Sequence, residues 1–106
     1  MDIKNSYAFE NLVAKIFSES GYTVKQGVQL ENKTGDIDII AEIDKRKYCV
    51  EVKYSRITER AMQRICDTAE SNKMIPLLVT AYDIDEKRKE YYQKQYPALI
   101  FVYITK

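Results

Sequence analysis

The sequence predicts a single α/β domain over residues 1–106, with a mixed β-sheet flanked by helices. Its length is typical of one domain that buries a modest core. Its apolar residues follow helical spacing first, then the alternation of three successive strands, and then a regular exchange of helix and strand. Three strands in succession, followed by such an exchange, favour a mixed sheet covered by helices. The predicted order is α-β-β-β-α-β-α-β.

The first part of the chain predicts a helix and a strand. A helix is expected over residues 6–20, with Ser6 as its N-cap and Gly21 as its stop. Residues 22–30 alternate between apolar and polar and predict a strand, and the segment ENKTG that follows has the composition of a loop. The helical spacing places these apolar residues on one arc: Phe9, Leu12, Val13, Ile16 and Phe17.

The remaining elements follow from similar signals. Thr58 is the expected N-cap of the second helix, and Asp83 or Asp85 that of the third. Met62, Ile65, Cys66 and Ala69 are expected to face inward from the second helix. The expected strands span 37–43, 48–54, 74–80 and 98–104, the expected helices span 58–72 and 84–96, and the turn between the first two of these strands is Asp-Lys-Arg-Lys, 44–47.

Composition excludes several classes of function. The chain contains no histidine, so histidine general-base chemistry and histidine-rich metal sites are excluded. Cys49 and Cys66 have no metal-binding spacing and are interpreted as reduced thiols. No apolar run approaches the roughly 20 residues that span a bilayer, and the N-terminus lacks a signal-peptide pattern. We therefore expect a soluble cytoplasmic protein without membrane association.

Charged residues interrupt the apolar pattern of two adjacent predicted strands. Side chains alternate across a strand, so Asp36 and Asp38 share a face with Ile40, opposite Ile37, Ile39, Ala41 and Ile43. On the next strand Glu51 and Lys53 share the corresponding face with Cys49, opposite Tyr48, Val50 and Val52. A turn with an even number of residues keeps the apolar faces matched, whereas an odd turn splits both faces. A two-residue turn at Lys45-Arg46 would place Asp38 opposite Lys53 and diagonal to Glu51.

A fourth acid borders this charged face. Glu10 lies at the edge of the apolar arc of the first helix, from which it can lean over the sheet. Converging carboxylates repel one another unless a cation or proton lies among them. A hard cation such as Mg²⁺ accepts carboxylate ligands, and a lysine beside it suits phosphodiester hydrolysis. The alternative is a solvated, salt-bridged sheet face without chemistry.

Four stretches resemble the restriction-endonuclease-like nucleases, the PD-(D/E)xK superfamily. The similarity is greatest to the Mrr-like and Holliday-junction-resolvase-like branch and spans nearly the whole chain. No proline precedes the aspartate here, which departs from the motif. The four stretches are FENLVAKIFSESGYTV, GDIDII, CVEVKYS and KMIPLLVTAYDIDEKRKEYY.

The resemblance implies a restriction-endonuclease-like fold and roles for individual residues. It implies Asp38 and Glu51 as the main metal ligands, and Glu10 as a ligand of a second metal or of a metal-bound water. Lys53 would lie beside the scissile phosphate. The family's metal-binding aspartate is usually followed directly by apolar residues, and Asp38, followed by Ile39 and Ile40, fits this pattern better than Asp36. Asp36 is therefore the alternative to Asp38 or an auxiliary residue. Gln63 is a further auxiliary candidate, unless it is an ordinary exposed helix residue.

The function that we expect is Mg²⁺-dependent endonucleolytic cleavage of DNA, with Mn²⁺ as a substitute, in restriction or in repair and recombination. Arg56, Arg60 and Arg64 are candidates for phosphate contacts, unless they form a solvated face. Specificity would require a homodimer, a fused domain or a partner. The alternative function is a catalytically inactive DNA-binding or assembly module with the same fold.

Overall fold

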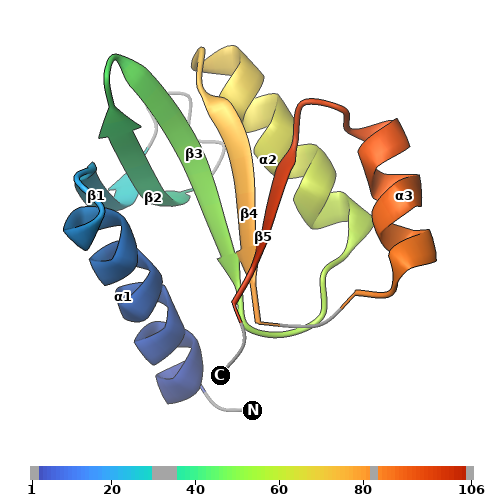
Figure 1. Ribbon diagram of the computed structural model, residues 1–106, viewed down its shortest axis with the longest axis horizontal. Coiled ribbons are helices and arrows are strands. Elements are labelled where there is room, and N and C mark those ends of the chain that lie inside the picture. Colours follow the sequence, from blue (N-terminus) through green and yellow to red (C-terminus); the bar gives the residue numbers. More distant parts are fainter. Residues whose placement is uncertain (1–2, 30–35, 82–83, 105–106) are drawn as a thin grey trace.

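The structure, a computed structural model, describes residues 3–29, 36–81 and 84–104. Within this part of the chain, one mixed sheet has the strand order β1-β2-β3-β4-β5 (Figure 1). β1, β2 and β3 pair antiparallel, whereas β3, β4 and β5 pair parallel. The bounds of the elements are α1 Ile3–Glu19, β1 Thr23–Gln29, β2 Asp36–Ile43, β3 Arg46–Lys53, α2 Glu59–Ser71, β4 Ile75–Thr80, α3 Glu86–Gln95 and β5 Ile100–Tyr103.

The fold class and the order of the elements are confirmed, and most of the predicted helix ends are found. The Ala61 N–H donates to Thr58 Oγ1 at the start of α2, and the Arg88 N–H donates to Asp85 Oδ1 at the start of α3. Gly21 follows α1 with a φ of +95°, a conformation that favours glycine. The loop ENKTG and the other cap candidate, Asp83, lie outside the described residues.

The predicted start of the first helix is wrong. α1 begins at Ile3, so Ser6 lies within the helix and is not its N-cap. Neither proline nor glycine occurs between Ile3 and Ser6, so nothing there opposes the helical backbone. A serine is tolerated inside a helix, and its preference for the N-cap is therefore too weak a signal to fix this boundary.

The turn between β2 and β3 has the predicted even length but lies one residue earlier than predicted. It consists of Asp44 and Lys45, whose φ angles are 49° and 67°. Positive φ at both central residues is the geometry that matches the twist of a two-residue hairpin, and aspartate tolerates it better than most residues. The closing pair is therefore Ile43 with Arg46.

This shift changes which charged residues face each other. The ladder between β2 and β3 runs from the pair Ile43 and Arg46 to the pair Ile39 and Val50. Continued by one step, this register would place Asp38 opposite Glu51 and not Lys53, although the ladder itself ends at Val50. The expected placement of Asp38 opposite Lys53 is wrong, because it assumed a turn at Lys45-Arg46.

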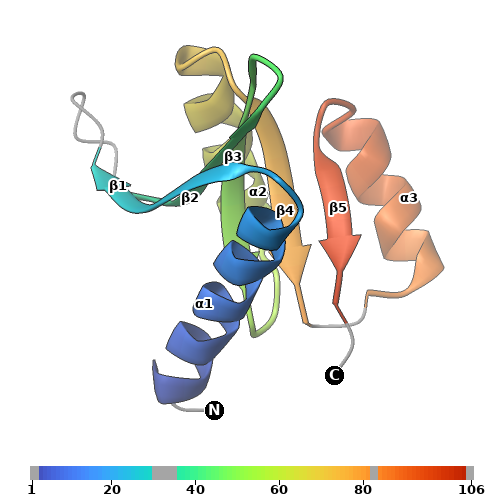
Figure 2. The ribbon, with the colours of Figure 1, turned by 60° about the vertical axis from the view of Figure 1, so that its left-hand side comes forward.

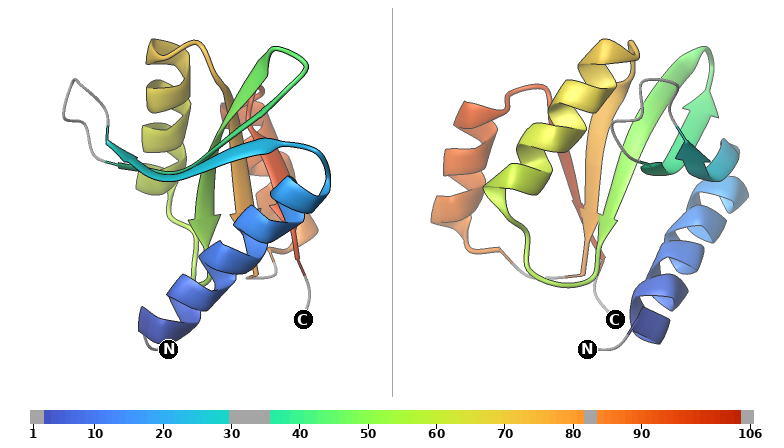
Figure 3. Two further views of the ribbon diagram at one scale, coloured as in Figure 1. Left: turned by 90° about the vertical axis from the view of Figure 1, so that its left-hand side faces the viewer. Right: turned by 180° about the vertical axis from the view of Figure 1, so that it is seen from behind.

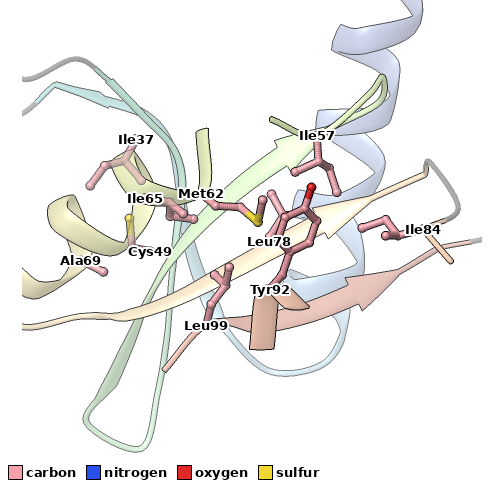
Figure 4. Close-up of a cluster of buried hydrophobic side chains, with 10 residues drawn as sticks. All are labelled: Ile37, Cys49, Ile57, Met62, Ile65, Ala69, Leu78, Ile84, Tyr92 and Leu99. Carbon is pink, nitrogen blue, oxygen red and sulfur yellow. The ribbon is translucent and has the colours of Figure 1, made fainter. Parts of the chain in front are cut away.

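Helices cover both faces of the sheet. α1 lies on one face, and α2 lies on the other beside α3 (Figures 2 and 3). The core beneath α1 includes Phe9, Val13, Ile39, Ala41 and Val50. The core beneath α2 and α3 is shown in Figure 4: Ile37, Cys49, Ile57, Met62, Ile65, Ala69, Leu78, Ile84, Tyr92 and Leu99.

Ile37 departs from the predicted alternation. It was expected to share a face with Ile39 and Ala41, but it packs in the core beneath α2, near Cys49 and Ala69 (Figure 4). β2 pairs with β3 only from Ile39 onward, whereas Ile37 pairs with Val28 of β1, which packs against the same core as Ile37. The expected alternation therefore fails at the part of β2 that lies beyond the ladder with β3.

No helix among the described residues is long and apolar enough to cross a membrane.

Candidate functional site

The predicted charged residues lie around one pocket at the end of β3. The pocket has a volume of about 540 Å³ and receives side chains from α1, β2, β3 and α2. Tyr7 and Tyr54 also line it, and the Tyr54 ring is held edge-to-face by Phe9 at a centroid distance of 5.4 Å. The charged residues that line the pocket are Glu10, Asp36, Asp38, Glu51, Lys53 and Arg64.

Asp38 is anchored where β2 and β3 separate. The ladder between the two strands ends at Val50, and the N–H of Val52, two residues further along β3, points toward β2. This N–H donates to Asp38 Oδ2 over 3.0 Å instead of joining the ladder. The carboxylate therefore satisfies a backbone donor at the end of the strand, and this contact fixes its position beside β3.

Glu51 is a buried carboxylate with two cationic neighbours. Only 6% of the residue is exposed. Its Oε2 lies 2.9 Å from Arg64 Nη2 and 3.6 Å from Lys53 Nζ. Burial raises the pKa of Glu51 above its usual range, and the negative charge of Asp38 raises it further, although Arg64 and Lys53 oppose this change. Glu51 is therefore buried and does not belong to a solvated sheet face.

Glu10 brings α1 into the same electrostatic neighbourhood. Gln26 Nε2 on β1 donates to Glu10 Oε2 over 3.2 Å, so the side chain is held above the sheet. Partial burial raises the pKa of Glu10, the hydrogen bond from Gln26 lowers it, and the charge of Asp38 raises it. Asp38 thus interacts unfavourably with two other carboxylates, Glu10 and Glu51.

Of the remaining candidate site residues, Asp36 lines the pocket, whereas Gln63, Arg56 and Arg60 do not. Asp36 is exposed and lines the pocket. Gln63 is not brought to the pocket: it is exposed and donates to Asp67 Oδ1, one turn along α2. Arg56 and Arg60 are exposed outside the pocket lining.

Sequence reasoning did not identify Arg64 as a partner of Glu51. It was expected only as a phosphate contact. Helical spacing places Arg64 on the outer part of α2, away from Met62 and Ile65, so no sequence pattern indicated this pair. The packing of α2 against β3 and the length of the arginine side chain bring the two charges together.

The carboxylates of the pocket fit partial coordination of a hard divalent cation. Among the described residues, no three acidic or cysteine side chains converge as a complete metal-binding set. Mg²⁺ does not require one, because it commonly uses one or two protein carboxylates together with water and phosphate oxygens. Asp38 and Glu51 could supply such a pair. Burial is the main cause of the raised pKa of Glu51, and a bound cation would stabilise the ionised carboxylate.

The charge on Glu51 predicts a pH dependence of stability without metal. Its folded pKa is raised above 4.5, so the folded protein binds more protons than the unfolded chain just above that pH. Its contribution to the free energy of unfolding therefore falls as pH rises from 4.5 through the folded pKa. Thermal unfolding in EDTA should show Glu51→Gln gaining stability relative to wild type across this window. A difference that is independent of pH would contradict the prediction.

Comparisons with known proteins show a family and a fold for this chain. The sequence model of the family described as "Restriction endonuclease" (Mrr_cat) matches residues 3–102. A crystal structure of a protein of unknown function, AF1548, superposes with a TM-score of 0.70 at 23% sequence identity, covering 89% of this chain and 55% of that one. The chain thus spans about half the length of this structural relative, and the likeness shows the fold alone. No curated protein matches the sequence.

Proposed function

Because the chain belongs to the restriction endonuclease family, we propose that it is a cytoplasmic endonuclease that hydrolyses DNA phosphodiester bonds with Mg²⁺, or with Mn²⁺ as a substitute. The observation that supports this most is the convergence of Asp38, Glu51 and Lys53 in one pocket. Two adjacent carboxylates and a cation suit the cleavage of an anionic ester, in restriction or in repair and recombination.

The residues of the pocket divide into metal ligands and a phosphate contact. Asp38 and Glu51 would hold the cation, and Glu10 would bind a second cation or orient a water molecule. When bound, the cation would supply charge neutralisation at the phosphate and activation of water. Lys53, whose side chain is 32% exposed, can reach a phosphate oxygen from the pocket wall. Its role would be to stabilise the negative charge that develops in the transition state.

A specific observation also favours the alternative function. Arg64 and Lys53 already neutralise Glu51 without any bound ion. A fold kept only for DNA binding or assembly would have the same internal ion pairs. Calorimetric titration with Mg²⁺ distinguishes the two functions, because a catalytically inactive module is not expected to bind the ion at Asp38.

The experiment that tests the proposal is a cleavage assay on four DNA forms: linear, methylated, nicked and four-way junction. Each form is incubated with Mg²⁺, Mn²⁺ or EDTA. We expect cleavage of at least one form with either cation and none in EDTA. Cleavage in EDTA would contradict the metal dependence. Absence of cleavage together with absence of Mg²⁺ binding would favour the inert module.

The basic residues outside the pocket support a role in DNA contact. Arg56 follows β3, and Arg60 lies in the first turns of α2, and both are exposed. Each would contact a backbone phosphate and contribute salt-dependent affinity without reading sequence. Recognition of a particular sequence or DNA structure would come from a homodimer, a fused domain or a partner protein.

We predict a homodimer, because cutting both strands requires two active sites or a second turnover, and twofold symmetry is the common solution. β5 lies at one edge of the described sheet, and its Ile100 and Tyr103 are about two-fifths exposed. Light scattering at roughly 100 μM should give the mass of a dimer, a concentration at which even weak symmetric contacts of micromolar Kd are populated. A monomer mass at that concentration would count against this assembly.

A further inference from the structure

Arg64 makes an ion pair that the proposed reaction does not explain. Its Nη2 lies 2.9 Å from Glu51 Oε2, and Lys53 Nζ lies 3.6 Å from the same oxygen. Both basic side chains therefore crowd one oxygen of a carboxylate that is proposed to bind a divalent cation. Positive charges at such short separations repel one another strongly away from bulk water. Binding of a divalent cation to Glu51 therefore favours the departure of one of them.

Arg64 is better placed to leave than Lys53. Its side chain is 48% exposed, against 32% for Lys53 and 8% for Glu51. It contacts the carboxylate through a single nitrogen and does not form the two-pronged pair that makes arginine–carboxylate contacts rigid. Its helix, α2, is fixed by burial of Met62 and Ile65, so the guanidinium can move without moving the backbone.

We propose that Arg64 is a positioning residue, which holds the Glu51 carboxylate in place until a divalent cation displaces it. This inference rests on the proposed metal-dependent function. Without the cation, Arg64 supplies the counter-charge that a buried carboxylate requires. With the cation bound, the guanidinium leaves Oε2 and remains at the mouth of the pocket. Arg64 therefore sets the cation concentration at which Glu51 becomes a ligand.

The test is a calorimetric titration with MgCl₂, without DNA, on wild type, Arg64→Met, Arg64→Lys and Arg60→Met. Removing the competing charge in Arg64→Met should raise Mg²⁺ affinity roughly fivefold to tenfold, the net scale of one ordinary hydrogen bond, because the Arg64 side chain is half exposed. Arg64→Lys restores the charge and should return affinity toward wild type. Arg60→Met removes an equal charge from the same helix, outside the pocket lining, and should bind Mg²⁺ like wild type.

Thermal unfolding of the same proteins provides a second measurement. In EDTA, Arg64→Met should unfold at a lower temperature than Arg60→Met, and saturating Mg²⁺ should remove most of that difference. If Arg64→Met does not fold, Arg64→Gln keeps a hydrogen-bond donor without the charge, and the same titration decides.

The outcomes separate this inference from the proposed function. If wild type binds Mg²⁺ and Arg64→Met binds it equally or more weakly, the inference is overturned and the proposed function stands. An equal gain in Arg64→Met and Arg60→Met would overturn it too, because the effect would then be one of general charge. If wild type does not bind millimolar Mg²⁺, both the inference and the metal-dependent function fail.

Discussion

Asp38→Asn and Glu51→Gln should each reduce DNA cleavage by roughly 10³-fold or more, because each removes a charged oxygen ligand at nearly constant shape. The fold should survive both changes. The amide oxygen of an asparagine at position 38 can still accept the Val52 N–H, as Asp38 Oδ2 does over 3.0 Å. A glutamine at position 51 removes a carboxylate whose ionisation burial disfavours. Cleavage rates, together with circular dichroism and thermal unfolding, provide the measurement.

Asp36→Asn is the matched control for these variants. Asp36 lines the same pocket but is exposed, and the same change of charge there should cost much less activity than Asp38→Asn. The comparison also decides which of the two aspartates is the main ligand. Full activity in purified Asp38→Asn or Glu51→Gln would refute the assignment of the metal ligands. A larger loss in Asp36→Asn than in Asp38→Asn would transfer the ligand role to Asp36.

Lys53→Met should separate metal binding from cleavage. The substitution removes the ammonium that lies 3.6 Å from Glu51 Oε2 and leaves the carboxylates in place. With less positive charge nearby, Mg²⁺ should bind as tightly as in wild type or more tightly. Cleavage should fall by several orders of magnitude, because stabilisation of developing charge is often the largest catalytic contribution. Calorimetry and a cleavage assay on one preparation measure both quantities.

The stability of Lys53→Met gives a further check. The metal-free protein should lose about 1 kcal/mol, the scale of a partly exposed ion pair. Lys47→Met removes the same charge from an exposed position on the same strand and should change neither metal affinity nor the rate of the chemical step. Wild-type cleavage by Lys53→Met would show that the charged face has another purpose. Absence of Mg²⁺ binding in both Lys53→Met and wild type would show the same.

The sequence alone determined the features that depend on local spacing. The order of helices and strands follows from the period of apolar residues, and the caps at Thr58 and Asp85 follow from side chains that reach their own backbone. Alternation along β3 correctly separated Cys49 from Val50, which lie in different cores. It also placed Glu51 on the Cys49 side, where α2 supplies Arg64.

Tertiary structure decided what depends on contacts between elements. The turn moved by one residue, to Asp44 and Lys45, because the closure of a hairpin depends on its twist and on which residues tolerate positive φ. Either even turn preserves the alternation of side chains, so the alternation could not distinguish between them. The observed register rules out the expected pairing of Asp38 with Lys53. The pair between Arg64 and Glu51 likewise depends on how α2 packs against β3, and no local pattern encodes that packing.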